Sequence, residues 1–262
     1  MWKLIPIVLL LAGCAASGNL PSNLQTGPAV QENPMVTELH DVPALDAPKM
    51  TIGVYSFTDR TGQRAPSDTG ASLSSAVTQG AEVWVIDALM EMGNGTWFDV
   101  MERSGMDNLI KERQLIRSTR ENYDTENAPA PALAPMKFAG IILEGGIVGY
   151  DSNITTGGTG ARYFGIGATT QYRVDTVTVS MRLVSVSTGR VLMTVAAEKS
   201  IASYASGAEA FKFLDLGTKA LELESGYTIN EPTNYAVRAA IEAAVIELAY
   251  EGVRKNLWNF VN

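Results

Sequence analysis

The spacing of apolar residues changes several times along the first part of the chain, and each change predicts a new element. Residues 51–57 (TIGVYSF) and 96–103 (TWFDVMER) have the apolar, β-branched and aromatic character of two strands. Between them, after a polar loop over residues 58–72, apolar side chains recur at helical spacing over residues 73–92. This part therefore predicts a strand, a long loop, a helix and a second strand.

The second part continues the alternation of helices and strands. We expect a short helix over residues 106–116, a linker rich in Pro and Ala over 118–136, and a strand over 139–150. Residues 174–201 contain two β-branched runs around a Ser-Thr-Gly turn, which is typical of a hairpin. From Glu231 on, a Pro in the first turn and apolar residues at helical spacing predict a C-terminal helix.

Strands that alternate with helices predict an α/β layer. We assign this layer to residues 49–153, 175–203 and 229–262. Two segments between these parts, residues 154–174 and 204–228, do not have the pattern of a soluble core.

The segment 204–228 alternates between apolar and polar positions in two arms, with a turn predicted at residues 215–217. Each arm has about ten residues, the length of a tilted transmembrane strand. In a membrane hairpin the apolar parity would face lipid and the charged parity would face a lumen. A soluble amphipathic hairpin gives the same alternation, so both interpretations stay open on pattern alone. The lipid-facing candidates are Phe211, Phe213, Leu221, Leu223 and Tyr227, and the lumen-facing candidates are Glu222 and Glu224.

The stretch TGGTGARYFGIGATTQYRV (156–174) has glycines that suit either a phosphate-binding loop or a strand hairpin. A phosphate loop needs its glycines between a strand and a helix, but here strand-like sequence follows and the spacing fits no nucleotide motif. Glycines in a membrane hairpin permit tight turns and close approach of strands. We therefore predict a transmembrane hairpin over Ile154–Val174.

The first residues, MWKLIPIVLLLAGC, have the form of a signal peptide over 1–13 that ends in a lipobox. The apolar run is too short to span a bilayer as a helix. Cys14 is the predicted lipidation site, and the absence of Asp after it implies sorting to the outer membrane of a Gram-negative bacterium. An ordinary signal peptide with a chance cysteine is the alternative. Residues 14–48, polar and broken by Pro, are interpreted as a tether.

Composition narrows the possible functions. The net charge is −8, which argues against a nucleic-acid surface. Cys14 is the single cysteine and His40 the single histidine, so a disulfide framework and a zinc site of Cys and His are excluded within one chain. His40 falls in the predicted tether, a poor place for a catalytic base. We expect no enzyme activity and no cofactor.

Three stretches carry a resemblance to a known family. GGTGARYFGIGATTQY, VSMRLVSVSTGRVL and ESGYTINEP are similar to the CsgG family of curli secretion channels, and the likeness extends from VYSFTDRTGQ to the terminal helix. The resemblance implies a palmitoylated outer-membrane lipoprotein that exports unfolded amyloid subunits through a ring of nine copies. Each copy would give four strands from two hairpins to a barrel of 36 strands, with Glu222 and Glu224 facing the lumen.

In that family the narrowest ring is made by the loop between the first strand and the first helix, and it carries a Tyr and an Asn-Phe pair. This chain has QRAPSDTGASLSSAV there, about one residue longer. Ser72 and Leu73 stand where Asn and Phe are expected, and Ser67 or Asp68 stands near the Tyr position. Without aromatic residues the ring is expected to be wider, with Asp68 adding negative charge. A plain solvated surface loop is the alternative.

The sequence thus favours a diffusion-driven pore, because no ATPase or other energy-transducing motif is found. Its expected partners are further copies of the chain, secreted amyloid subunits, periplasmic and surface accessory proteins of a curli-type system, and outer-membrane lipid. An outer-membrane anchoring lipoprotein of an adhesin or holdfast system, without fibre export, is the second hypothesis.

Overall fold

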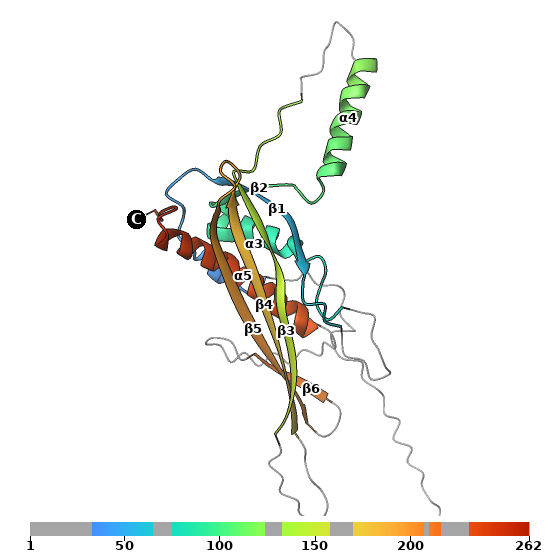
Figure 1. The fold of residues 1–262 in the computed structure, drawn as a ribbon, viewed down its shortest axis with the longest axis vertical. Helices are drawn as coiled ribbons and strands as arrows, with labels where there is room; N and C mark the ends of the chain where they lie inside the picture. Colours follow the sequence, from blue (N-terminus) through green and yellow to red (C-terminus); the bar gives the residue numbers. More distant parts are fainter. Residues whose placement is uncertain are drawn as a thin grey trace, which may run out of the picture. The chain divides into compact units, whose positions relative to one another are not determined.

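A computed structural model describes residues 33–64, 75–123, 133–157, 170–206, 210–215 and 231–261. The described strands form one six-stranded sheet in the order β2-β1-β3-β4-β5-β6 (Figure 1). The strands are β1 Met50–Asp59, β2 Phe98–Met101, β3 Ile141–Gly157, β4 Thr170–Ser185, β5 Val191–Ser206 and β6 Ala210–Asp215. The helices are α2 Val36–His40, α3 Glu82–Gly95, α4 Met106–Tyr123 and α5 Glu231–Arg254.

The sheet has a parallel half and an antiparallel half that meet at β3. Strand β1 pairs in parallel with both β2 and β3, whereas β3, β4, β5 and β6 pair in antiparallel succession. The predicted α/β layer is therefore confirmed as a mixed sheet with helices packed on it. The predicted strands of the layer and the hairpin around Ser187-Thr188-Gly189 are confirmed as well.

The core lies between the sheet and the helices α3 and α5, which cover one face of it (Figure 1). Every second residue of β4, from Val177 to Leu183, is buried, as the period of a half-buried strand requires. Helix α5 packs on this face with small residues at helical spacing, including Ala240 and Ala244, which let it approach the strands closely. The predicted C-terminal helix is confirmed.

Helix α3 begins later than predicted. The apolar spacing placed a helix over residues 73–92, but α3 starts at Glu82, and residues 75–81 form a bridge, bends and a turn. Two local hydrogen bonds explain the late start: the Gly80 N–H donates to the Thr78 hydroxyl, and the Gln79 amide donates to the Val77 carbonyl. Such side-chain bonds compete with the helical ladder, and Gly80 adds a further cost.

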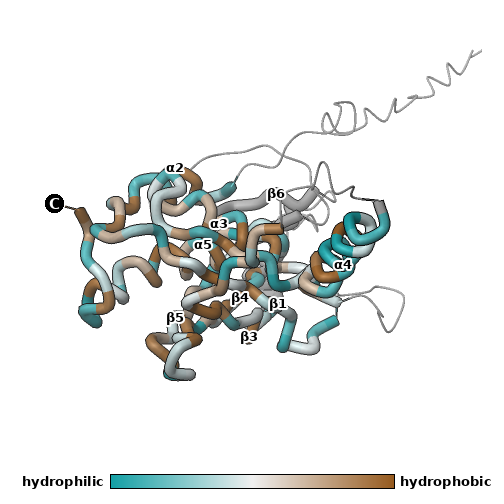
Figure 2. The backbone as a smooth tube through the Cα atoms, turned by 90° about the horizontal axis from the view of Figure 1, so that it is seen from above, coloured by the Kyte–Doolittle hydropathy of each residue, from teal (hydrophilic) through white to brown (hydrophobic). Residues whose placement is uncertain are grey.

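Helix α4 is longer than predicted, because it includes residues 118–123, which were assigned to the linker. Its last turns are polar but contain good helix formers, and the Asn122 amide donates to the Ser118 carbonyl one turn before it. Helix α4 carries mostly hydrophilic residues (Figure 2). Leu115 on this helix is 58% exposed.

Residues 33–48, assigned to the tether, fold against the body; we call them the N-terminal strap. Leu39, Val42 and Leu45 are buried in the common core, and the Trp97 indole N–H donates to the Pro43 carbonyl at 2.9 Å. The strap also pairs with the end of the chain through an antiparallel bridge between Leu45 and Phe260. The tether interpretation is therefore wrong for these residues, because the polar pattern hid three apolar positions spaced by three.

Candidate functional site

Strand β3 runs without interruption from the core of the body into the glycine-rich stretch. It pairs with β4 from Ile141 opposite Ser185 to Gly157 opposite Thr170. Its parallel partner β1 ends at Asp59, opposite Ile147. Beyond Ile147, β3 therefore has β4 as its described partner, and this part belongs to the antiparallel half of the sheet. The strand predicted over 139–150 is thus part of β3, which continues into the first two residues of the glycine-rich stretch.

Two adjacent glycines let β3 pass between β1 and β4. A Cβ on Gly145 would press on the Ser180 carbonyl oxygen and lie 2.6 Å from the Phe57 ring. A Cβ on Gly146 would lie 2.5 Å from the Thr58 carbonyl oxygen and 3.2 Å from the Arg60 guanidinium. These contacts are too short for any side chain, so glycine is required by close approach of the neighbouring strands. Strand β1 has an irregularity at this level, between Val54 and Phe57.

The strands of the two predicted membrane hairpins lie side by side in one sheet. Ile154 of β3 is opposite Arg173 of β4, and Tyr172 of β4 is opposite Tyr204 of β5. Strand β5 then pairs with β6, with Tyr204 opposite Lys212. The described parts of both segments therefore lie next to one another at the same level, as four successive antiparallel strands.

The first arm of the second segment is not a single strand. The alternation suggested one arm from residue 204 to 214 and a turn at 215–217, but Ser206 of β5 is opposite Ala210 of β6. The chain reverses between these two residues. The predicted turn, apart from Asp215, lies outside the described residues. The long β4–β5 ladder sets the direction of β5, whereas parity alone says nothing about where a strand reverses.

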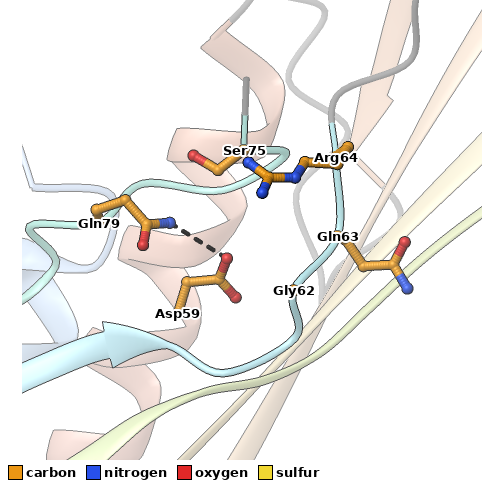
Figure 3. A pocket seen from close by; sticks show the side chains of 6 residues that line it. All are labelled: Asp59, Gly62, Gln63, Arg64, Ser75 and Gln79. Carbon is orange, nitrogen blue, oxygen red and sulfur yellow. Dashed lines mark hydrogen bonds between the residues drawn. The ribbon is translucent and has the colours of Figure 1, made fainter. Parts of the chain in front are cut away.

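The loop between β1 and α3 has a described base, which we call the loop stem: Asp59, Thr61, Arg64, Ser75 and Gln79. Arg64 and Ser75 form an isolated antiparallel bridge, so the residues on either side of segment 65–74 are held together. The Ala76 N–H also donates to the Gln63 carbonyl at 3.0 Å. Side chains of the stem line a pocket of about 310 Å³ (Figure 3).

Asp59 organises this stem. One carboxylate oxygen accepts the backbone N–H of Thr61 at 2.8 Å and its hydroxyl at 2.7 Å. The other carboxylate oxygen accepts the Gln79 amide at 3.2 Å (Figure 3). Burial opposes ionisation of this carboxyl, but the bonds from Thr61 and Gln79 and the positive charge of Arg64 outweigh it. The pKa of Asp59 is therefore lowered. The stem thus holds the two ends of the loop together by charge-assisted hydrogen bonds from Asp59 and by the Arg64–Ser75 bridge.

Most predicted site residues lie outside the described part of the chain. This holds for the lipidation site, the four constriction candidates and five of the hairpin candidates: Cys14, Ser67, Asp68, Ser72, Leu73, Leu221, Glu222, Leu223, Glu224 and Tyr227. Phe211 and Phe213 occupy alternate register positions in β6, opposite Ala205 and Ser203. Their assigned facing stays a prediction.

His40, the single histidine, lies at the end of α2. Its Nε2 is 2.8 Å from the Glu91 carboxylate of α3, so it joins the strap to that helix. Within the described ranges, no group of three His, Cys, Asp or Glu side chains is arranged to hold a metal ion. No described helix is both long and apolar enough to cross a membrane.

The fold and the strand continuity can now be set beside known proteins. A family model described as "Curli production assembly/transport component CsgG" matches residues 35–262. The chain belongs to the CsgG family. Curated proteins of this description from Salmonella typhimurium (strain LT2) and Escherichia coli (strain K12) are 40% and 39% identical to it. These matches cover 97% and 99% of this chain, and 89% and 91% of the relatives.

The family resemblance seen in the sequence is thereby confirmed. A solved PelC dodecamer from Paraburkholderia phytofirmans matches 79% of this chain and 91% of its own at 16% identity and a TM-score of 0.29. That likeness is too weak to carry any argument about assembly of this CsgG-family chain.

Sequence reasoning missed the loop stem, although a signal for it was present. An Asp followed by Thr and Gly (Asp59 to Gly62) is a typical pattern for side-chain-to-backbone turns. It also missed the glycine pair of β3, whose role depends on two partner strands that lie far away in the sequence. The loop stem, the glycine pair Gly145 and Gly146, and the paired strands β3 to β6 make up the candidate site of this CsgG-family chain.

Proposed function

We propose that this chain is a subunit of an oligomeric outer-membrane lipoprotein pore that exports unfolded curli-like amyloid subunits by diffusion. The observation that carries the proposal is the continuity of β3 to β6, which brings the two predicted membrane segments together as neighbouring antiparallel strands. Membership of the CsgG family supports it. Lipidation at Cys14 would anchor each subunit to the outer membrane.

Four strands per chain require several chains in one barrel. An open sheet edge in lipid leaves backbone N–H and C=O groups without partners, which costs several kcal/mol for each group. When several copies contribute their strands to one closed barrel, no strand edge is left without a hydrogen-bonded neighbour. The resemblance gives nine copies, and nine times four strands make a barrel of 36. In this proposal Glu222 and Glu224 face the lumen, whereas Phe211, Phe213, Leu221, Leu223 and Tyr227 face lipid.

The loop above the stem forms the narrowest point in this proposal. Ser67, Asp68, Ser72 and Leu73 belong to the segment whose two ends are joined at Arg64 and Ser75. A ring of Asp68 carboxylates in a confined passage would concentrate cations. Leu73 would be the only bulky apolar side chain among these four for a passing polypeptide.

Electron microscopy of the detergent-solubilised complex tests the assembly. The expected result is a closed ring with a membrane barrel. A monomer, or a ring with no density across the detergent belt, would overturn the pore and favour an anchoring lipoprotein of an adhesin or holdfast system.

Planar-bilayer recording tests the constriction independently. Replacing Ser72-Leu73 by Asn-Phe should narrow the pore and lower the single-channel conductance, and Asp68→Asn should reduce cation selectivity. The control is Gln63→Ala, next to the stem, because the Gln63 side chain points away from Asp59 (Figure 3). Equal conductance and reversal potential in all three variants would remove the loop from the permeation path while leaving the barrel in place.

A further inference from the structure

A buried cluster of charges joins α5, α3 and the start of the strap, far from the loop stem. Arg238 and Glu242 are one turn apart on α5, and their side chains are only 6% and 1% exposed. The Arg238 Nε donates to the Glu242 carboxylate at 2.9 Å, and one of its terminal nitrogens donates to Asp87 of α3 at 2.5 Å. Asp87 is 43% exposed, so the cluster opens toward solvent on that side.

Two remaining bonds of the cluster reach the strap rather than the body. The Met35 backbone N–H donates to the second carboxylate oxygen of Glu242 at 2.8 Å. The side-chain oxygen of Asn33 accepts a hydrogen bond from the same terminal nitrogen of Arg238 that reaches Asp87. Both oxygens of Glu242 are thus used, one by α5 and one by the strap.

Stability of the body does not explain why charges occupy this position. A buried ion pair often contributes no more to folding than apolar residues of similar volume, because removing two charges from water is expensive. Burial raises the pKa of Glu242, although the Met35 N–H and Arg238 act in the opposite direction and Asp87 adds to the rise. With a raised pKa, the contribution of this carboxyl to stability is fullest at low pH and falls as pH rises through that pKa.

The rest of the strap is held by contacts outside this cluster, among them the hydrogen bond between His40 Nε2 and the Glu91 carboxylate. Leu39, Val42 and Leu45 fill the core, and backbone bonds join the strap to the chain end: Asp46 N–H to the Asn259 carbonyl and Val261 N–H to the Ala44 carbonyl, both at 2.9 Å. These contacts fix the strap from Leu39 on. Residues 33–35 have polar contacts with the charged cluster instead.

We propose that the Arg238–Glu242–Asp87 cluster is a docking site for the start of the N-terminal strap, which fixes the point where the preceding chain leaves the body. The consequence rests on the proposed function, in which Cys14 carries the lipid. From Cys14 to Asn33 there are 33 − 14 = 19 residues, which span at most roughly 65 Å when fully extended. Undocking as far as Leu39 would lengthen the free chain to 39 − 14 = 25 residues, roughly 85 Å. Docking at the cluster therefore shortens the free chain between the lipid anchor and the first fixed residue by 25 − 19 = 6 residues.

Hydrogen exchange measured by mass spectrometry on the purified full chain tests the docking site. The variant Arg238→Met with Glu242→Leu replaces the pair by apolar side chains of similar size, so α5 should remain packed. We expect exchange in residues 33–38 to rise at least tenfold, while exchange in residues 240–250 of α5 stays unchanged. The matched control, Arg254→Met with Glu251→Leu, removes a more exposed pair on the same helix, with side chains 54% and 25% exposed, and should change neither region.

Two results would overturn the inference. Unchanged exchange in residues 33–38 would mean that the strap holds without the cluster, and a uniform rise along the chain would mean that the cluster only stabilises the body. If the double variant does not fold, Asn33→Ala removes one acceptor from the strap side and should raise exchange there about threefold; no rise would also refute docking. None of these readouts needs a lipid or a pore, so failure of the docking site and failure of the proposed function are separate outcomes.

Discussion

Gly145→Ala is the change that most directly tests how β3 is fitted between its neighbours. The new methyl group would press on the Ser180 carbonyl oxygen and lie 2.6 Å from Phe57 Cε2 and 3.0 Å from the Met181 Cα. Two of these three atoms belong to the β4 backbone, which is held in register from Ser185 to Thr170. The clash therefore cannot be relieved by rotating one flexible side chain.

The expected cost follows from two opposing effects. Overpacking in a well-packed site costs about 1–3 kcal/mol, and a clash with backbone atoms belongs at the upper end of that range. Replacing Gly by Ala also reduces the conformational entropy of the unfolded chain, which stabilises the fold by about 0.4–1 kcal/mol. The cost of the clash exceeds the entropic gain, so the variant should lose about 2 kcal/mol of unfolding free energy. In a chain of this size that corresponds to a decrease in Tm of about 4–8 °C.

The thermal midpoint of Trp fluorescence measures this loss, at fixed protein and detergent concentrations. Gly80→Ala is the matched control, because the nearest atom to its new methyl group is the Glu82 carboxylate at 3.9 Å and its φ lies outside the left-handed region. We expect this control to melt within about 2 °C of the wild type, the scale of less than 1 kcal/mol. If Gly145→Ala melts together with the control, close approach of the strands is not what requires glycine, and the account of β3 is wrong.

Three further changes test other parts of the structure. Gly252→Ala would place a methyl group inside the Trp258 ring, which should swing outward, so that the Trp emission shifts to longer wavelength relative to wild type. Asp59→Asn should lower the urea midpoint at pH 7. Because the pKa of Asp59 is depressed, its contribution is present above the usual Asp pKa and is lost as pH falls through the lowered value, so the two midpoints should converge at low pH. Cys14→Ser should leave the outer-membrane fraction, since the hydroxyl cannot accept the lipid; wild-type amounts there would refute lipid anchoring.

Sequence periodicity predicted the elements whose pattern is set locally. Helix α5 follows directly from its apolar residues at helical spacing, and β4 follows from its alternation. The same logic failed at the start of α3. Ala76 and Val77 continue the helical period, but the Thr78 hydroxyl accepts the Gly80 N–H and the Gln79 amide donates to the Val77 carbonyl. Apolar spacing reports which residues face a core, but it does not report which backbone conformation brings them there.

The strap shows a different limit. Pro43 and Pro48 and the surrounding polar residues indicated a tether, while Leu39, Val42 and Leu45 were present as a spacing of three that could have argued against it. The contacts that hold the strap come from residues about 50 to 200 positions away, such as Trp97 and Glu242. No local pattern contains that information. The family motifs, in contrast, were visible in the sequence because they are long and specific.

The mixed sheet explains why the predicted membrane segments lie where they do. Parallel strands need long crossover connections, so the β2-β1-β3 half of the sheet cannot extend away from the helices that cover it. Antiparallel strands need only short turns, and β4 and β5 are joined within the body by the turn between Ser185 and Val191.

At the other end β3, β4, β5 and β6 extend together. Beyond Ile147, β3 no longer pairs with β1, and β6 is the last described strand in the sheet order. The ribbon of four strands thus has β3 at one edge and β6 at the other, and under the proposed function the β6 edge of one copy would meet the β3 edge of the next. Closure then requires no new element in the chain, because the edges left by one subunit are complementary to those of its neighbour.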